Sequence, residues 1–154
     1  MAKAKITLPE GFLNKCFRLG ERTDDILASV LKAGGAVVLE KVKNNLRAVI
    51  GKDTKLPSKS TGELLSSLGL SPAKVDRNGI HNIKVGFNEP RRRQRATKGK
   101  RSYYTATNAM VANVIEHGRH GQLARPFLKP AKSAARKPCQ EAMQARLEEE
   151  LNKL

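Results

Sequence analysis

The sequence predicts an α+β fold, with a long N-terminal helix and a C-terminal helix packed on a small antiparallel β-sheet, and a long basic loop. Aliphatic residues recur at three- and four-residue steps through residues 23–51 and again through 126–154, as in amphipathic helices. Apolar and other residues alternate over 82–87, as in a strand with one buried face. Residues 88–105 are rich in Lys and Arg and have no apolar period.

The length and charge of the chain bound its class. A chain of 154 residues suits one domain spanning residues 1–154. It carries 30 Lys and Arg against 14 Asp and Glu, a net charge of +16, which favours polyanions or acidic protein surfaces as partners. No apolar run approaches the ~18 residues of a membrane span, and no signal peptide is expected.

The reactive side chains form no recognisable catalytic or metal site. Cys16 and Cys139 are expected to be reduced thiols, because two cysteines make neither a disulfide framework nor a metal-ligand spacing. His117 and His120 flank Gly118, which breaks the helix that would align them, and no third ligand lies nearby. There are no paired carboxylates, no nucleophile motif and no phosphate-binding glycine loop. We therefore expect neither a cofactor nor an enzymatic activity.

The N-terminal third is predicted to contain an arm and one long helix. Residues 1–22 are expected to form a flexible arm or a short helical turn. Thr23 is a suitable N-cap, and the helix that follows should end near Gly51. Gly34 and Gly35 interrupt this helix at a cost of about 1 kcal/mol each relative to alanine. Such a pair predicts either the close approach of another backbone or a kink.

A loop and a second, short helix are expected next. Residues 51–61 contain helix breakers and no periodicity. The segment 61–68 is predicted to be helical, with Ser60 or Thr61 as its cap and Gly69 as its stop.

Residues 70–87 are predicted to form a β-hairpin. Asn78-Gly79 is a preferred turn dipeptide, because both positions tolerate positive φ. The partner strand should cover about 70–76, at a sheet edge because it contains Pro72. A two-stranded ribbon is marginal alone, so it needs a covering helix or pairing between subunits. The alternating apolar residues are Ile83, Val85 and Phe87.

The basic loop, residues 88–105, is the sharpest indication of a partner. So long a loop without structure is uncommon unless it is functional or disordered, and we expect it to be mobile. Its cations could contact nucleic-acid phosphates, with Tyr103 and Tyr104 stacking on bases; they could contact an acidic protein; or they could simply be solvated. The candidate contact residues are Arg91, Arg92, Arg93, Arg95, Lys98, Lys100 and Arg101.

Two helices are expected after this loop. Thr107 should cap the first, whose predicted apolar face consists of Met110, Val111, Val114 and Ile115. In the second, Pro138 should cause a kink or a restart, because proline lacks the backbone donor and clashes with the preceding turn. The predicted apolar stripe of this helix consists of Cys139, Ala142, Met143, Leu147, Leu151 and Leu154.

Residues 112–131 join these two helices and are predicted to form a rigid corner. Gly118 should end the first helix, and Phe127 should anchor the start of the second. Glu116 is expected to act as a cap or salt-bridge partner rather than as an acid catalyst. The segment is therefore interpreted as scaffold.

Three motifs together resemble a known family. They are P-x-x-x-T-G-x-L-x-x-S from Pro57, A-x-x-I-E-x-G from Ala112 and R-P-F-L-x-P-A from Arg125. In this order they are similar to the tail-completion or head–tail joining (neck) proteins of tailed bacteriophages, also described as minor tail or minor capsid components. The resemblance covers roughly residues 23–150. Its motif residues include Thr61, Gly62, Leu64, Glu116, Gly118, Pro126, Phe127 and Pro130.

The resemblance implies a non-enzymatic virion protein, with assembly in the host cytoplasm. Such proteins form rings, commonly sixfold, between the portal-side connector and the tail tube, so the implied partners are further copies of the chain and the connector and tail proteins. The isolated chain is then expected to be monomeric or weakly associating, with residues 88–105 sensitive to protease. The competing interpretation is a free-standing basic DNA- or RNA-binding protein, although no signature of a nucleic-acid-binding fold stands out.

Overall fold

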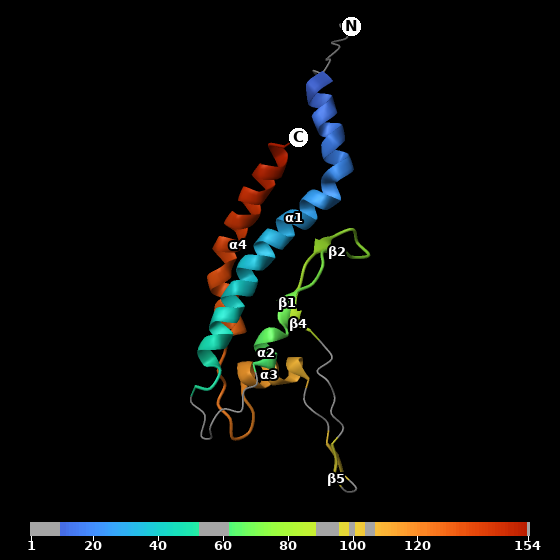
Figure 1. The fold of residues 1–154 in the computed structure, drawn as a ribbon. Helices are drawn as coiled ribbons and strands as arrows, with labels where there is room; N and C mark the ends of the chain where they lie inside the picture. The colour runs from blue at the N-terminus through green and yellow to red at the C-terminus, as the bar shows by residue number, and fades with distance from the viewer. Residues whose placement is uncertain (1–9, 53–61, 89–95, 99–100, 104–106, 154) are drawn as a thin grey trace, which may run out of the picture.

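The computed structural model describes the backbone of residues 10–52, 62–88, 96–98, 101–103 and 107–153, and the side chains of 19–52, 62–88 and 107–153. Two long helices, α1 and α4, lie side by side, with a β-hairpin and two shorter helices against α1 (Figure 1). This arrangement confirms the α+β class. The helices are α1 (Glu10–Val49), α2 (Glu63–Ser66), α3 (Asn108–His117) and α4 (Leu128–Leu151).

Helix α1 begins earlier than predicted. It starts at Glu10, so residues 10–22, which were expected to form an arm, are helical; residues 1–9 lie outside the described residues. Thr23 is not the N-cap, because it lies inside the helix, where its hydroxyl donates to the carbonyl of Leu19 at 2.6 Å. The aliphatic repeat begins only at Leu27, whereas the helix itself begins at Glu10.

The two central glycines of α1 allow close packing on two sides. A Cβ atom on Gly34 would lie 2.5 Å from Cγ of Met143 and 3.0 Å from Sγ of Cys139, both in α4. A Cβ atom on Gly35 would lie 2.9 Å from Cδ2 of Leu70 in the hairpin. Both glycines therefore allow close packing, with a different neighbour at each, but the neighbouring atoms belong to side chains and not to the backbone that was predicted.

The hairpin contains two short antiparallel ladders. Strand β1 (Leu68–Leu70) pairs with β4 (Val85–Phe87), and β2 (Lys74–Val75) pairs with β3 (His81–Asn82). The predicted pairing partner is correct in outline. However, Pro72 lies between the ladders rather than inside a strand, which splits the expected strand into β1 and β2.

The turn of the hairpin is the predicted one. Gly79 has φ of 76°, in the left-handed region that favours glycine. The carboxylate of Asp76 accepts the backbone N–H groups of Asn78 at 2.8 Å and of Ile80 at 2.9 Å. The side chain of Asp76 thus closes the turn, as aspartate does in many turns.

Two details predicted around α2 are wrong. The N-cap of α2 is Gly62, with φ of 75° and no side-chain cap bond, rather than Ser60 or Thr61. Gly69 does not end the helix, because it lies within β1. The left-handed backbone at Gly62 turns the chain into the helix.

The basic loop is not wholly without structure. Strand β5 (Ala96–Lys98) pairs with β6 (Arg101–Tyr103) in an antiparallel ladder, in which Lys98 faces Arg101. The expectation of a structureless segment over 88–105 is therefore wrong for these residues. Alternating apolar residues are absent here, so no strand was predicted.

Helix α3 has the predicted cap and part of the predicted apolar face. The hydroxyl of Thr107 accepts the backbone N–H of Met110 at 3.2 Å. Met110 itself is 60% exposed, whereas Val111 and Ile115 pack against the core and Asn108, Ala112 and Glu116 are buried. The predicted apolar face is therefore correct in part, and it missed two buried side chains because they are polar.

Helix α4 is continuous, and it packs through small side chains. It passes through Pro138 without interruption, so the predicted restart is wrong. Leu147 and Leu151 of the predicted stripe are 37% and 41% exposed, whereas Ala131 and Ala135 are buried. Small residues on α4 and a glycine on α1 let the two helices approach closely, and this packing compensates for the donor that proline lacks.

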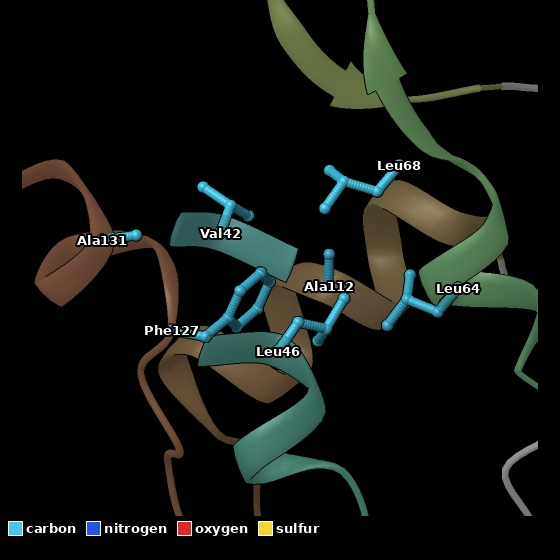
Figure 2. Close-up of a cluster of buried hydrophobic side chains, with 7 residues drawn as sticks. All are labelled: Val42, Leu46, Leu64, Leu68, Ala112, Phe127 and Ala131. Carbon is cyan, nitrogen blue, oxygen red and sulfur yellow. The ribbon is translucent and has the colours of Figure 1, made fainter. Parts of the chain in front are cut away.

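The core lies where α1, α2, α3 and the start of α4 meet (Figure 2). Phe127 and Leu46 are fully buried at its centre. The ring of Phe127 meets that of Phe87 edge to face, with centroids 6.4 Å apart and an interplanar angle of 73°. The buried cluster consists of Val42, Leu46, Leu64, Leu68, Ala112, Phe127 and Ala131.

Candidate functional site

The corner between α3 and α4 is built around the carboxylate of Glu116. Its Oε2 atom accepts the backbone N–H groups of Phe127 at 2.7 Å and of Leu128 at 2.8 Å, and Oε1 accepts that of Lys129 at 3.0 Å. These are the orphan donors at the start of α4. The next residue is Pro130, which has no N–H to satisfy. A side chain from one helix thus caps another helix completely.

This role lowers the pKa of Glu116. Burial alone would raise the pKa of the carboxyl. The hydrogen bonds from the backbone of Leu128, Phe127 and Lys129 together lower the pKa by more than burial raises it, with a smaller contribution from the charge of His117. The net result is a pKa below the ordinary value of a glutamate. Glu116 is therefore an ionised cap and not a poised general acid.

Gly118 ends α3 with a backbone that no other residue readily adopts. Its φ is 76°, and its N–H donates to the carbonyl of Val114 at 2.8 Å. A Cβ atom there would lie 2.8 Å from the backbone nitrogen of Ala124 and 2.8 Å from the carbonyl oxygen of Gln122. The position therefore requires glycine both for its conformation and for space.

Arg125 connects the corner to the end of α1, a role that the sequence analysis did not assign. Its Nη1 atom donates to the carbonyl of Val49 at 3.1 Å and to that of Lys52 at 2.8 Å. Its backbone N–H donates to the carbonyl of Ile115 at 2.8 Å. The signal was present as the first residue of the R-P-F-L-x-P-A motif. Arg125 caps carbonyls at the C-terminus of α1, where the helix dipole favours a cation.

Phe127 is fixed by its backbone as well as by its ring. Its carbonyl accepts a hydrogen bond from Nδ2 of Asn45 at 3.2 Å, and its N–H is held by Glu116. Asn45, which interrupts the aliphatic repeat of α1, is thus a polar link between α1 and α4. Pro126 and Pro130, on either side of the phenylalanine, are exposed.

The remaining motif residues lie around α2. Gly62 forms the left-handed N-cap of this helix, and Leu64 is 7% exposed within the core. Thr61 lies outside the described residues. The three motifs therefore meet on one core, in which Leu64, Ala112 and Phe127 all belong to the buried cluster (Figure 2).

Of the predicted basic contact residues, the structure describes only Lys98 and Arg101. Lys98 and Arg101 are partners in the β5–β6 ladder, and the structure describes their backbone only. Their role in contacting a partner stays a prediction. The other members lie outside the described residues: Arg91, Arg92, Arg93, Arg95 and Lys100.

One buried polar group has no partner on one of its atoms. Asn108 is 2% exposed; its Nδ2 donates to the carbonyl of Asn88 at 3.4 Å, whereas its Oδ1 accepts no bond in the described structure. The amide ties the start of α3 to the strand end that precedes the basic loop.

Several kinds of site are not found in the part of the chain that the structure describes. No group of three or more His, Cys, Asp and Glu side chains could hold a metal ion there. None of the described helices is long and apolar enough to cross a membrane.

An open groove of about 870 Å³ lies between α1 and the hairpin, lined mainly by small and apolar residues such as Ala33, Ala36 and Ile83.

Comparison with known proteins places the chain in a family. Residues 10–118 match the family model described as "Bacteriophage HK97-gp10, putative tail-component". The match covers two of the three motifs and ends at the glycine that closes α3. Comparison with curated proteins and with solved structures returned no match. The chain therefore belongs to the HK97-gp10-like family of bacteriophage tail components.

Proposed function

We propose that this chain is a non-enzymatic structural subunit of a tailed phage, which assembles as a ring at the head–tail junction or the tail end and completes or joins the tail. The proposal rests on the structural role of the motif residues, which cap helices. Glu116 and Arg125, their charged members, cap α4 and α1 through hydrogen bonds to backbone groups. A motif that fixes the relative directions of helices suits a scaffold.

Exposed apolar side chains support a role in assembly. Val75 and Ile80, at the tip of the hairpin, are 54% and 59% exposed, and Leu123 in the corner loop is 77% exposed. The two-stranded ladders are also short and have open edges. Such features are typical of surfaces that are covered by a partner. The proposed partners are further copies of the chain and the connector and tail proteins.

The basic segment 91–101 is proposed to face a neighbouring subunit or the DNA that passes through the particle. Along the chain it follows β4 and precedes α3, and both of these elements contribute residues that pack on the core. In this proposal the protein assembles in the host cytoplasm and then resides in the virion.

The test is deletion of the gene from the phage, followed by electron microscopy and infectivity measurement. We expect tails that are incomplete or not joined to heads, and recovery when the gene is supplied in trans. Intact, infectious particles without this protein would contradict the proposal.

Mass spectrometry of purified virions separates the proposal from its alternative. A free-standing DNA- or RNA-binding protein would be absent from virions, and its nucleic-acid affinity would fall with salt at a log–log slope of about −0.9 per phosphate contact. A virion subunit would be present in stoichiometric amount.

A further inference from the structure

The charge of the two long helices is separated along their length, and the cations gather where α1 ends and α4 begins. Asn45 of α1 donates to Phe127 at 3.2 Å, so these two helix ends adjoin (Figure 1). We call residues 41–52 and 129–137 together the basic end; they contain no Asp or Glu. Their cations are Lys41, Lys43, Arg47, Lys52, Lys129, Lys132, Arg136 and Lys137.

Acidic residues gather away from the basic end, near the C-terminus of α4 and at residues 21–25 of α1. Ser29 of α1 lies one helical turn after residue 25 and donates to Oε1 of Glu150 at 3.5 Å, so residues 21–25 and 148–150 lie near each other. We call these two segments the acidic end; Arg22 is their only cation. Their acids are Glu21, Asp24, Asp25, Glu148, Glu149 and Glu150.

This distribution does not serve the stability of α4. The helix dipole favours anions at the N-terminus and cations at the C-terminus. Along α4 the order is reversed: its first turn holds no acidic residue, its cations Lys129 and Lys132 come early, and a run of three glutamates ends the helix. The capping carboxylate of Glu116 offsets part of this cost at the N-terminus, and the ion pairs of Glu149 and Glu150 with Arg146 offset part of it at the C-terminus. The helix dipole alone therefore does not explain this order of charges.

Charges at both ends are available for a partner. Lys129, Lys132 and Arg136 are exposed and make no ion pair within the described part of the chain. At the acidic end the same holds for Glu21, Asp25 and Glu148. In contrast, Glu149 and Glu150 are already paired with Arg146.

We infer that the basic end of one copy binds the acidic end of the next copy, a contact that rests on the proposed assembly into a ring. A polyanion would account for the basic end alone, whereas a second copy accounts for both ends. Contact between two different patches is heterologous, and such contacts generate closed rings when the rotation closes. The partner is thus the chain itself, recognised by charge.

The overall charge of +16 does not prevent this contact. At physiological salt, charges more than about 8 Å apart are largely screened, so pairs at the contact outweigh distant repulsion. The contact should consequently weaken as salt rises, and close pairing should fix the register of the subunits.

The experiment reverses charge at each end of the full-length chain. The basic-end variant is K129E/K132E, and the acidic-end variant is E21K/D25K/E148K. The matched control is K32E/K84E, two exposed lysines outside both ends and outside the hairpin tip, which changes the net charge as much as the basic-end variant K129E/K132E does. Self-association is measured by sedimentation velocity and chemical cross-linking at low and physiological salt, and circular dichroism checks the fold.

We expect each single-end variant to lose self-association by at least about tenfold, and the control to retain it. Mixing the two single-end variants, or combining both in one chain, should restore association. Association that is unchanged in both variants, or a wild type that stays monomeric at low salt, would overturn the inference. Loss of DNA binding in the basic-end variant with unchanged self-association would also overturn it and assign that end to nucleic acid.

Phage complementation separates this inference from the proposed function. If the inference fails while the function holds, single-end variants will still restore joined tails to the deletion phage. If the function fails, the wild-type gene itself will be dispensable.

Discussion

The Oε2 atom of Glu116 accepts the backbone N–H of Phe127 at 2.7 Å, so the cap of α4 and the central ring of the core are positioned by one bond. Glu116 belongs to α3, and the ring of Phe127 packs in the same buried cluster as Val42 and Leu46 of α1. A shift of α3 should therefore move the ring of Phe127 as well. The corner therefore behaves as one unit, and substitutions within it should couple.

Replacing Glu116 with alanine should destabilise the protein strongly. Three N–H groups at the start of α4 would lose their acceptor, and hydrogen bonds to a charged group contribute about 1.5–3 kcal/mol each before relaxation. We expect a loss of about 3 kcal/mol in the free energy of urea unfolding. Glu116→Gln, which keeps one acceptor oxygen, should lose less; equal losses would contradict the capping role.

The stability difference between wild type and Glu116→Gln should depend on pH. The pKa of Glu116 is lower in the folded than in the unfolded state, so its contribution is fully present above the unfolded value of about 4.3. It is then lost as the pH falls through the folded pKa. Urea unfolding between pH 7 and pH 3 should therefore show the two proteins converging at low pH. A constant difference would show that the carboxylate charge is not what stabilises α4.

Gly118→Ala and Gly121→Ala form a matched pair. Both glycines have φ near 75°, but a Cβ atom meets the backbone only at Gly118 and nothing within 4 Å at Gly121. Gly121→Ala should cost about 1–2 kcal/mol from its left-handed conformation alone. Gly118→Ala should cost clearly more in thermal or urea unfolding, and equal costs would show that the loop relaxes freely.

Phe127→Ala should remove the centre of the core. The side chain is fully buried and meets Phe87 edge to face, so the change should lower the free energy of unfolding by about 3–5 kcal/mol. Phe127→Leu should cost less, because it keeps most of the volume. A small effect of the alanine substitution would mean that the core collapses around the cavity.

Gly34→Ala and Gly20→Ala should have opposite effects although both lie in α1. Alanine in place of glycine favours a helix by about 1 kcal/mol, and a Cβ atom on Gly20 would meet nothing within 4 Å. At Gly34 it would meet Met143, so we expect Gly20→Ala to raise the melting temperature and Gly34→Ala to lower it. The double substitution Gly34→Ala/Met143→Ala should cost less than the two single changes added together, as a double-mutant cycle would measure.

Features set by short-range chemistry could be predicted from the sequence. Thr107 as a cap and Asn78-Gly79 as a turn each act within a few residues, and both are confirmed. The glycine pair of α1 also indicated close packing correctly, because the absence of a side chain inside a helix needs a reason. The three motifs identified the phage family from their order, which the match over residues 10–118 confirms.

Features set by tertiary contacts could not be predicted. The start of α1 lacked a signal because Thr23 can cap a helix or lie within one, and only the whole fold decides. The apolar pattern of α3 identified Val111 and Ile115 but missed the buried Glu116, which is satisfied by backbone groups that are distant in sequence. The capping role of Arg125 likewise depends on the end of α1 lying beside it. The contacts of the basic segment 91–101 stay a prediction.

The cap at Glu116 also determines where this chain can be divided. The family match ends at residue 118, yet the helix beyond it is held by a carboxylate inside the match and covers Gly34 of α1. The end of the match is therefore not a folding boundary. Cutting the chain in the exposed loop at Gly121 should yield two fragments that are separately unstable but reassemble when mixed, because each carries half of one capped helix junction.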